Sequence, residues 1–224
     1  MDLIDRIDKL IDERHLLTHP FYTKWAEGTL PREALQEYAR QYYAFESSFP
    51  RFLSAIHART ESAEVRQQLL DNLWDEEHGP DNHAELWLRF AEGVGVERDD
   101  VRSAKRNEAT QALVELYGEL SRTAPVAEGV AALYAYERQV PQVSGSKIEG
   151  LKKHFGVDDA RSLEFFVLHG ELDIEHSGAE REMLRTLITD ADPAPIEQAA
   201  RRALDGWWNF LSAVDQPVAV TATA

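Results

Sequence analysis

The segment His169-Gly-Glu-Leu-Asp173-Ile-Glu-His176 places two histidines and an aspartate at helical spacing. At about 100° per residue, Asp173 and His176 lie about 40° and about 20° to opposite sides of His169, so all three share one narrow helix face. Two imidazoles and a carboxylate on one face form half of a site for a divalent metal ion. The alternative is three polar residues on a solvated face, and this segment alone leaves both open.

Two glutamates stand four residues before a proline: Glu76 before Pro80, and Glu137 before Pro141. A proline removes the hydrogen bond to the carbonyl group four residues earlier and clashes with it, so we expect each glutamate at a helix kink. Glu137 lies in an apolar, aromatic segment, where a buried carboxylate needs a partner such as Arg138 or a metal ion. The alternative is that both prolines only shape the helices.

Adding one more histidine gives a set of three carboxylates and three imidazoles: Glu76, His83, Glu137, His169, Asp173 and His176. Three carboxylates carry −3 and two divalent ions carry +4, so a bridging hydroxide would make a partly buried site neutral. Oxygen and imidazole donors without sulfur favour iron or manganese. The chain lacks the repeated Glu-x-x-His pair of ferritin-like proteins, so we expect a different helical bundle.

Composition excludes several other classes of protein. The 224 residues include 40 Asp and Glu against 24 Lys and Arg, a net charge of −16, which argues against nucleic-acid binding. The absence of cysteine excludes disulfides, thiolate metal sites and a cysteine nucleophile. No apolar run approaches the roughly 18 residues of a membrane span, and the charged N-terminus has no apolar signal core. We therefore expect a cytoplasmic protein without a membrane partner.

Helical periodicity extends along almost the whole chain, and no window alternates for long enough to predict a strand. The fold class is therefore all-α, a compact bundle of seven to nine helices, with residues 1–215 as a single domain and 216–224 as a disordered C-terminal tail. Helices are expected over residues 2–15, 20–26, 31–47, around 52–57, 62–77, 83–92, 106–122, 125–154, 159–189 (with or without a break at Gly170) and 194–214.

At these residues the chain resembles the haem-oxygenase-like dimetal oxidases, in the superfamily of TenA-type thiaminases and the PQQ-synthesis protein PqqC. Within it, the chain is most similar to the group of the Chlamydia protein associating with death domains. All six candidate ligands occur in order at the family's positions. The resemblance extends from about His19 to about Met183 and includes Phe49-Pro50-Arg51-Phe52-Leu53, Asn72-Leu73-Trp74-Asp75-Glu76-Glu77, Asn82-His83, Glu137-Arg138-Gln139-Val140-Pro141 and Ser146-Lys147-Ile148-Glu149-Gly150.

The resemblance implies a TenA/PqqC-type fold, a homodimer and unusual chemistry. In this group two redox metals, Fe/Fe or Fe/Mn, activate O2 with electrons from an external reductant, and the protein consumes its own side chains to make 4-aminobenzoate, a folate precursor. The matching positions are Tyr22 as ring donor and Lys147 as amino donor, with Tyr38 and Tyr136 relaying oxidising equivalents near the metals. Without the family, Tyr22 would be interpreted as a core-edge tyrosine and Lys147 as a solvated helix lysine. The electron donor is not identified.

Two further functions stay open at this point. A dimetal oxidase or oxygenase acting on an external small molecule would keep the ligands but would not need Tyr22 or Lys147. A non-catalytic interaction module would need no metal site, and no feature of the chain encodes such binding. Thiaminase activity is disfavoured because it uses a cysteine nucleophile, and a cofactorless PqqC-type oxidase would not need the carboxylates. In a haem pocket, these buried carboxylates would be costly.

Overall fold

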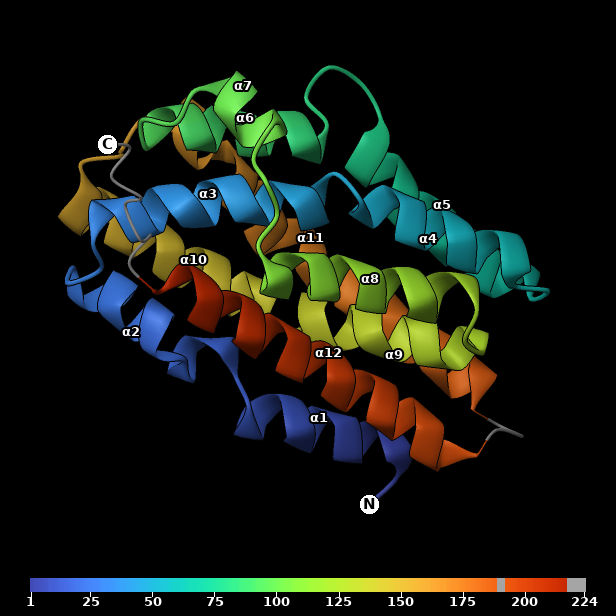
Figure 1. Ribbon diagram of the computed structural model, residues 1–224. Coiled ribbons are helices and arrows are strands. Elements are labelled where there is room, and N and C mark those ends of the chain that lie inside the picture. Colours follow the sequence, from blue (N-terminus) through green and yellow to red (C-terminus); the bar gives the residue numbers. More distant parts are fainter. Residues whose placement is uncertain (189–191, 217–224) are drawn as a thin grey trace.

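The computed structural model describes residues 1–188 and 192–216, which fold into helices joined by short turns (Figure 1). This confirms the expected all-α fold class. Residues 217–224 of the predicted tail lie outside the described part. The α-helices are α1 (Leu3–Glu13), α2 (Pro20–Glu27), α3 (Arg32–Glu46), α4 (Phe49–Arg59), α5 (Ala63–Glu77), α6 (His83–Gly93), α7 (Arg98–Arg102), α8 (Glu108–Arg122), α9 (Val126–Glu137), α10 (Val140–Gly150), α11 (Ala160–Leu187) and α12 (Pro193–Val214).

The chain is divided more finely than the sequence predicts. The expected helix over 125–154 is three pieces, because α9 ends at Glu137, α10 begins at Val140, and a π-helical turn (Leu151–Phe155) follows. Pro141 causes the first of these breaks, as its spacing from Glu137 predicts. The five-residue α7 was not expected, because hydrophobic periodicity needs a window of about 11 residues or more.

In contrast, α11 continues through Gly170 without a break. A glycine inside a helix costs about 1 kcal/mol relative to alanine, but it keeps its N–H group and therefore the helical hydrogen bond. Asp159 begins this helix by accepting a hydrogen bond from the backbone N–H of Ser162 at 2.9 Å. The result is an unbroken 28-residue helix, long enough to carry the whole His169-to-His176 face past several neighbouring helices.

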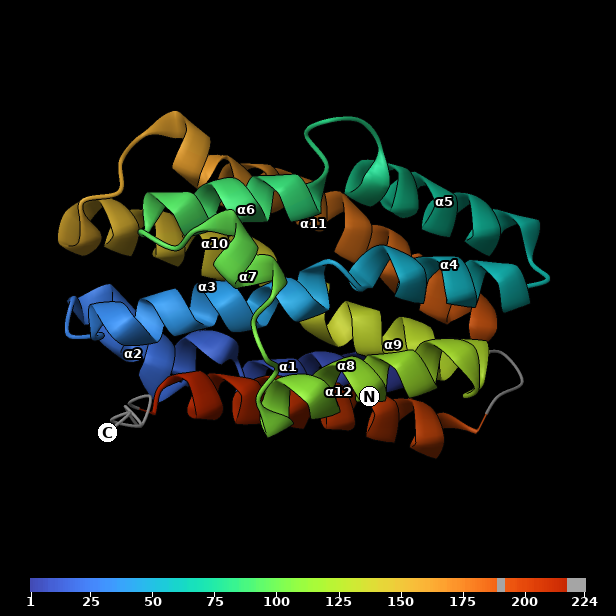
Figure 2. The same cartoon turned by 45° about the horizontal axis from the view of Figure 1, so that its top comes forward.

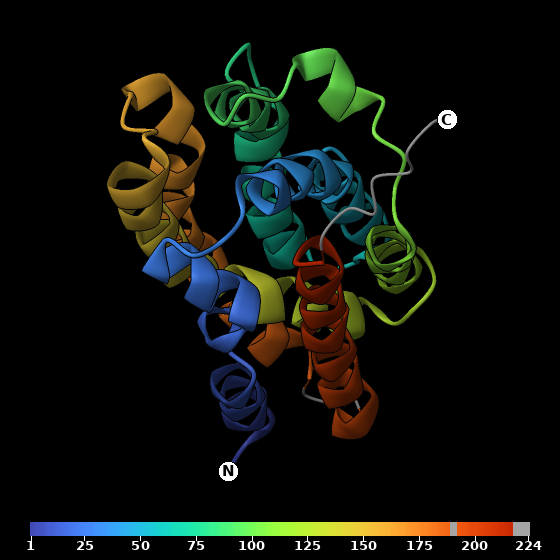
Figure 3. The same ribbon diagram turned by 60° about the vertical axis from the view of Figure 1, so that its left-hand side comes forward.

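The centre of the bundle is α3, which packs against α6, α7, α8 and α12. In Figure 3, where the helices are seen nearly end-on, α3 lies among these neighbours. In Figure 1, α4 continues roughly in the direction of α3 after a short interruption. The long α11 packs against α6, α9 and α10, and Figure 2 shows α6 and α11 side by side. These contacts bring the ends of α3, α5 and α9 toward the middle of α11.

Apolar side chains from α1 to α12 form one buried cluster, in which Trp25, Trp87 and Trp207 are almost completely inaccessible to solvent. Along the described ranges, no helix is both long and apolar enough to cross a membrane. The close approach of α2 to α10 depends on Gly150, because a Cβ there would lie 2.7 Å from Nε1 and 3.1 Å from the carbonyl oxygen of Trp25.

We therefore expect Gly150→Ala to lower the free energy of unfolding by about 1–2 kcal/mol, because overpacking outweighs the gain in helix propensity. Gly145→Ala in the same helix is the matched control, since a Cβ at Gly145 meets no atom within 4 Å. That control should raise the free energy by up to about 1 kcal/mol. Urea unfolding of both variants measures the difference, and equal effects would contradict the packing argument.

Candidate functional site

The six predicted ligands come from α5, α6, α9 and α11, and all are buried. The structure brings Glu137, Asp173 and His176 into one group, in which one donor atom from each lies within 4.8 Å of the others. His83 and His169 form a second group with a residue that was not predicted, Glu46. Two sets of oxygen and nitrogen donors thus lie in the core of the bundle.

His176 faces two carboxylates through its Nδ1 atom, which lies 3.5 Å from Asp173 Oδ1 and 3.9 Å from Glu137 Oε2. Its other ring nitrogen, Nε2, hydrogen-bonds at 3.1 Å to Asp75 Oδ2, near the surface. A carboxylate on the far side of a histidine ring fixes the ring's orientation and leaves the opposite nitrogen available to a metal ion. Nδ1 is therefore the atom that this histidine offers.

Hydrogen bonds from outside the donor groups also fix the side chains of His169 and Glu137. His169 Nδ1 hydrogen-bonds to the carbonyl oxygen of Phe165 at 2.7 Å, which leaves Nε2 as its free nitrogen. The side-chain amide of Asn72 donates to both carboxylate oxygens of Glu137, at 3.2 and 3.3 Å. Such outer partners orient metal ligands in proteins, and the sequence analysis did not identify Asn72 or Asp75 in this role.

Among the six predicted ligands, Glu76 and His83 make a close contact with each other. Glu76 Oε2 and His83 Nδ1 lie 2.9 Å apart, yet neither atom has a hydrogen bond. Two ligands that each lie about 2.1 Å from one metal ion, at right angles, are about 3.0 Å apart. The pair is therefore spaced as two ligands of a common ion would be.

Several other donor atoms of the site are buried without a hydrogen-bond partner: Glu46 Oε1, His83 Nε2, Asp173 Oδ2 and His176 Nδ1. Leaving a buried polar atom unpaired costs about 1–3 kcal/mol. Divalent cations would satisfy such atoms, and carboxylate with imidazole is a donor set that suits iron or manganese. The residues present therefore fit a pair of such ions.

Burial dominates the acid–base behaviour of these groups. It raises the pKa of Glu46 and of Glu76 well above the ordinary value, and with Asp173 it raises the pKa of Glu137 to about 8. Burial also lowers the pKa of His83 and His169, which keeps both imidazoles neutral, the form that binds metal. A bound cation favours the ionised carboxylates and replaces the protons that they otherwise need.

The pKa of His176 is shifted in the opposite direction to that of His83 and His169. Burial by itself lowers its pKa, but hydrogen bonds and negative charge from Asp173, Glu137 and Asp75 outweigh this effect and raise the pKa to about 10. Without a cation, His176 therefore carries the positive charge that the surrounding carboxylates require. A metal ion bound at this group would take over that role.

Lys147 and Tyr22, predicted from the family resemblance, lie together in the core. Lys147 Nζ donates a hydrogen bond to the Tyr38 hydroxyl at 2.8 Å, and this hydroxyl lies 3.2 Å from that of Tyr22. The ammonium nitrogen is 5.4 Å from the centre of the Tyr22 ring and 5.0 Å from that of Phe166. Lys147 is 4% exposed, so the interpretation as a solvated helix lysine is wrong.

Tyr136 belongs to a second pair, in which its hydroxyl hydrogen-bonds to that of Tyr42. Tyr136 stacks on Trp207 at 4.5 Å, and Tyr42 stacks on Trp87 at 4.0 Å. Tyr42 was not predicted, although its position four residues after Tyr38 places both on one face of α3. The two tyrosine pairs meet through the rings of Tyr38 and Tyr42, whose centres are 5.5 Å apart.

Comparison with known proteins gives the family. Residues 36–208 match the family described as iron-containing redox enzymes. The chain belongs to this family. It is 43% identical to 4-aminobenzoate synthase of Chlamydia pneumoniae, with 93% of each chain covered, and 39% identical to 4-aminobenzoate synthase of Nitrosomonas europaea, with 94% of this chain and 90% of the relative covered. These matches confirm the resemblance expected from the sequence.

More distant relatives define the wider superfamily. Pyrroloquinoline-quinone synthase of Ruegeria pomeroyi is 29% identical over 74% of this chain and 69% of its own. A TenA homologue from Pseudomonas syringae superposes with a TM-score of 0.80 at 19% identity, with 95% of this chain and 90% of that chain covered. The structural likeness shows that this family member shares the TenA-type fold.

Glu46 was missed, although the sequence contains a signal that identifies it. Pro50 stands four residues after Glu46, the same spacing that directed attention to Glu76 and Glu137. In all three cases a helix ends at or next to the glutamate, because the proline prevents its continuation. The aromatic run Tyr-Tyr-Ala-Phe before Glu46 hides it among core positions.

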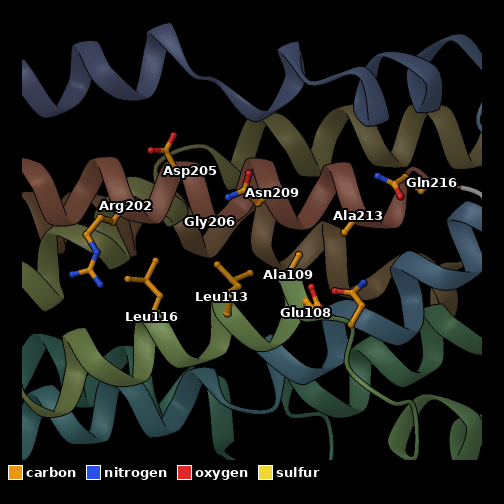
Figure 4. A pocket seen from close by; sticks show the side chains of 12 residues that line it. Glu108, Ala109, Leu113, Leu116, Arg202, Asp205, Gly206, Asn209, Ala213 and Gln216 are labelled. Carbon is orange, nitrogen blue, oxygen red and sulfur yellow. The ribbon is translucent and has the colours of Figure 1, made fainter.

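The site comes nearest to the surface between α5 and α11. A small pocket of about 170 Å³ there is lined by Asn72, Asp75, Glu175 and His176, among others. A groove of about 760 Å³ lies elsewhere, between α8 and α12 (Figure 4). Its walls include Leu113, Leu116 and Arg202 and contain none of the predicted site residues. We therefore place access to the donor groups at the α5–α11 mouth.

Burial lowers the pKa of Lys147 from 10.5 to about 7. Between these two pH values the unfolded chain holds a proton on this lysine that the folded chain lacks, so folding stability contributed by the group rises with pH. The test quantity is the free energy of unfolding of the wild type minus that of Lys147→Met. Between pH 7 and pH 10.5 we expect this difference to rise by about 1.4 kcal/mol per pH unit.

Urea unfolding of the metal-free proteins at several pH values measures this slope. Groups that titrate in this window without interacting with Lys147 cancel in the difference between the two proteins, whereas Glu46 and Asp173 interact with it. Lys152→Met, at an exposed lysine of the same region, is the control for replacing a lysine by methionine. A flat difference for Lys147→Met would show that its amine stays charged in the core.

Proposed function

We propose that this protein is a dimetal oxygenase of 4-aminobenzoate synthesis that uses its own Tyr22 as ring donor and Lys147 as amino donor. The main observation that supports this proposal is a distance: Lys147 Nζ lies 5.4 Å from the centre of the Tyr22 ring. Both side chains lie in the core, near two groups of side chains that could hold metal ions. The product needs an aromatic ring and a nitrogen, and these two side chains supply them. The 37–43% identity to proteins named 4-aminobenzoate synthase supports the same reaction.

The proposed ligands divide between two positions. Glu76, His83 and His169 would hold one ion, and Glu137, Asp173 and His176 would hold the other. An Fe/Fe or Fe/Mn pair supplies activation of O2, with electrons from an external reductant. The iron-containing family supports this choice of metals. Asn72, Asp75 and the Phe165 carbonyl keep Glu137, His176 and His169 aimed at these positions.

Lys147 must act as a free amine, because an ammonium group has no lone pair. Its burial among aromatic rings lowers its pKa to about 7, so a large fraction is neutral near neutral pH. Its hydrogen bond to the Tyr38 hydroxyl holds the nitrogen in place. Since that hydroxyl accepts from Lys147, it is free to donate its own proton to Tyr22, 3.2 Å away. Tyr38 thereby positions both donors.

The tyrosines of α3 and α9 provide a route for oxidising equivalents. Tyr38 and Tyr136 have the relay role that the family resemblance implies, and Tyr42 joins them. The ring of Tyr42 lies 5.5 Å from Tyr38, whose ring lies 6.4 Å from Tyr22. A phenol is readily oxidised, and the surrounding apolar side chains exclude water that would quench a reactive intermediate. The route ends at the proposed ring donor.

Isotope labelling tests the proposal directly. Protein carrying ring-¹³C tyrosine and ¹⁵N lysine is supplied with iron, manganese, a reductant and air, and the released 4-aminobenzoate is analysed by mass spectrometry. We expect the product to carry both labels and the intact protein to change in mass. Tyr22→Phe and Lys147→Met should abolish product, because each removes one donor. Tyr43→Phe and Lys152→Met, at neighbouring positions outside the cluster, are the matched controls.

An unlabelled product, or full activity of Tyr22→Phe, would overturn the self-sacrificing mechanism. That result would favour a dimetal oxygenase acting on an external small molecule, since the ligand groups would be unaffected. A wild-type protein that binds no redox metal would overturn both.

A further inference from the structure

Glu46 is a buried carboxylate that the proposed ligand set does not use. It is the last residue of α3, its side chain is 4% exposed, and its Oε1 atom has no hydrogen-bond partner. An ionised carboxylate in such a place requires a cation or dedicated donors. No hydrogen-bond donor among the described residues reaches Oε1, and a bound cation would compensate it.

The position of Glu46 relative to two imidazoles is that of a ligand. One donor atom each of Glu46, His83 and His169 lies within 4.8 Å of the others, and the three side chains come from α3, α6 and α11. Two histidines and one carboxylate that leave other positions open are typical of non-haem iron sites in oxygenases. Glu76 on α5 lies beside this group, with its Oε2 atom 2.9 Å from His83 Nδ1.

Charge supports the same arrangement. Glu46 and Glu76 are both buried carboxylates, and both lie beside the ring of His83. Two buried carboxylates that repel each other are stabilised by a cation between them. With Glu46 the site has four carboxylates, so −4 balances the +4 of two divalent ions without a bridging hydroxide.

We infer that Glu46 is a seventh metal ligand of this chain, which completes the His83–His169 position with a carboxylate from α3. This inference rests on the proposed dimetal site and adds a residue to it. The local sequence agrees with this role. Like Glu76 and Glu137, Glu46 is followed four residues later by a proline, and its helix ends before that proline. The same helix carries Tyr38 and Tyr42 at four-residue intervals, so α3 connects the metal position to the Lys147 cluster over about 12 Å.

Manganese binding by the metal-free, full-length protein tests the inference independently of activity. Mn²⁺ is titrated into wild type, Glu46→Gln and Glu180→Gln, and free Mn²⁺ is measured by electron paramagnetic resonance. Glu180 is the matched control, because it is equally buried on α11, its oxygens also lack partners, and it belongs to neither donor group. Glu46→Leu is the second variant, since the amide oxygen of glutamine retains weak affinity for metal.

We expect two equivalents of Mn²⁺ for wild type and for Glu180→Gln. In Glu46→Gln and Glu46→Leu, one equivalent should weaken by about tenfold or more while the other is retained. Circular dichroism of the metal-free variants checks that each is folded.

Wild-type binding of both equivalents by Glu46→Gln and Glu46→Leu would overturn the inference and leave the dimetal site intact. Equal weakening in Glu180→Gln would also overturn it, because the effect would then be a general response of the core. Failure of the wild type to bind two equivalents would overturn the proposed function together with it.

Discussion

Carboxylates and imidazoles that are removed from water must be compensated within the protein, and this requirement governs the centre of the bundle. Glu46, Glu76, Glu137 and Asp173 lie in one small region of the core together with three histidines. Either protons or cations can neutralise the negative charge of these carboxylates. In the part of the chain that the structure describes, several of the donor atoms have no hydrogen-bond partner. Two divalent ions would satisfy both the charge and the coordination of these groups.

The helices position this cluster in two different ways. Along α11, an uninterrupted helix carries His169, Asp173 and His176 on one face. The glutamates instead come from helix ends next to Pro50, Pro80 and Pro141, where the chain turns away and a glutamate at or beside the last helical position is buried. The negative ends of those helices add to the electrostatic attraction for a cation. Outer partners such as Asn72 and Asp75 then limit the rotation of individual ligands.

The low-polarity interior that surrounds Lys147 favours the neutral form of its amine. Lys147 is surrounded by aromatic rings and has a tyrosine hydroxyl as its hydrogen-bond partner. Desolvation opposes its charged form, while the carboxylates of Glu46 and Asp173 support it. The lysine and the donor groups are therefore electrostatically coupled, and α3 supplies residues to both.

The amino-acid sequence by itself determined the helical fold class, the helix-ending effect of Pro141 and the shared face of His169, Asp173 and His176, because these depend on local spacing. Only the tertiary structure decided that Glu46 joins His83 and His169, that Lys147 is buried against Tyr38, and that Tyr42 pairs with Tyr136. These contacts join residues 37 to 123 positions apart in the chain. Local periodicity contains no information on such distances, since they follow from how whole helices pack against one another.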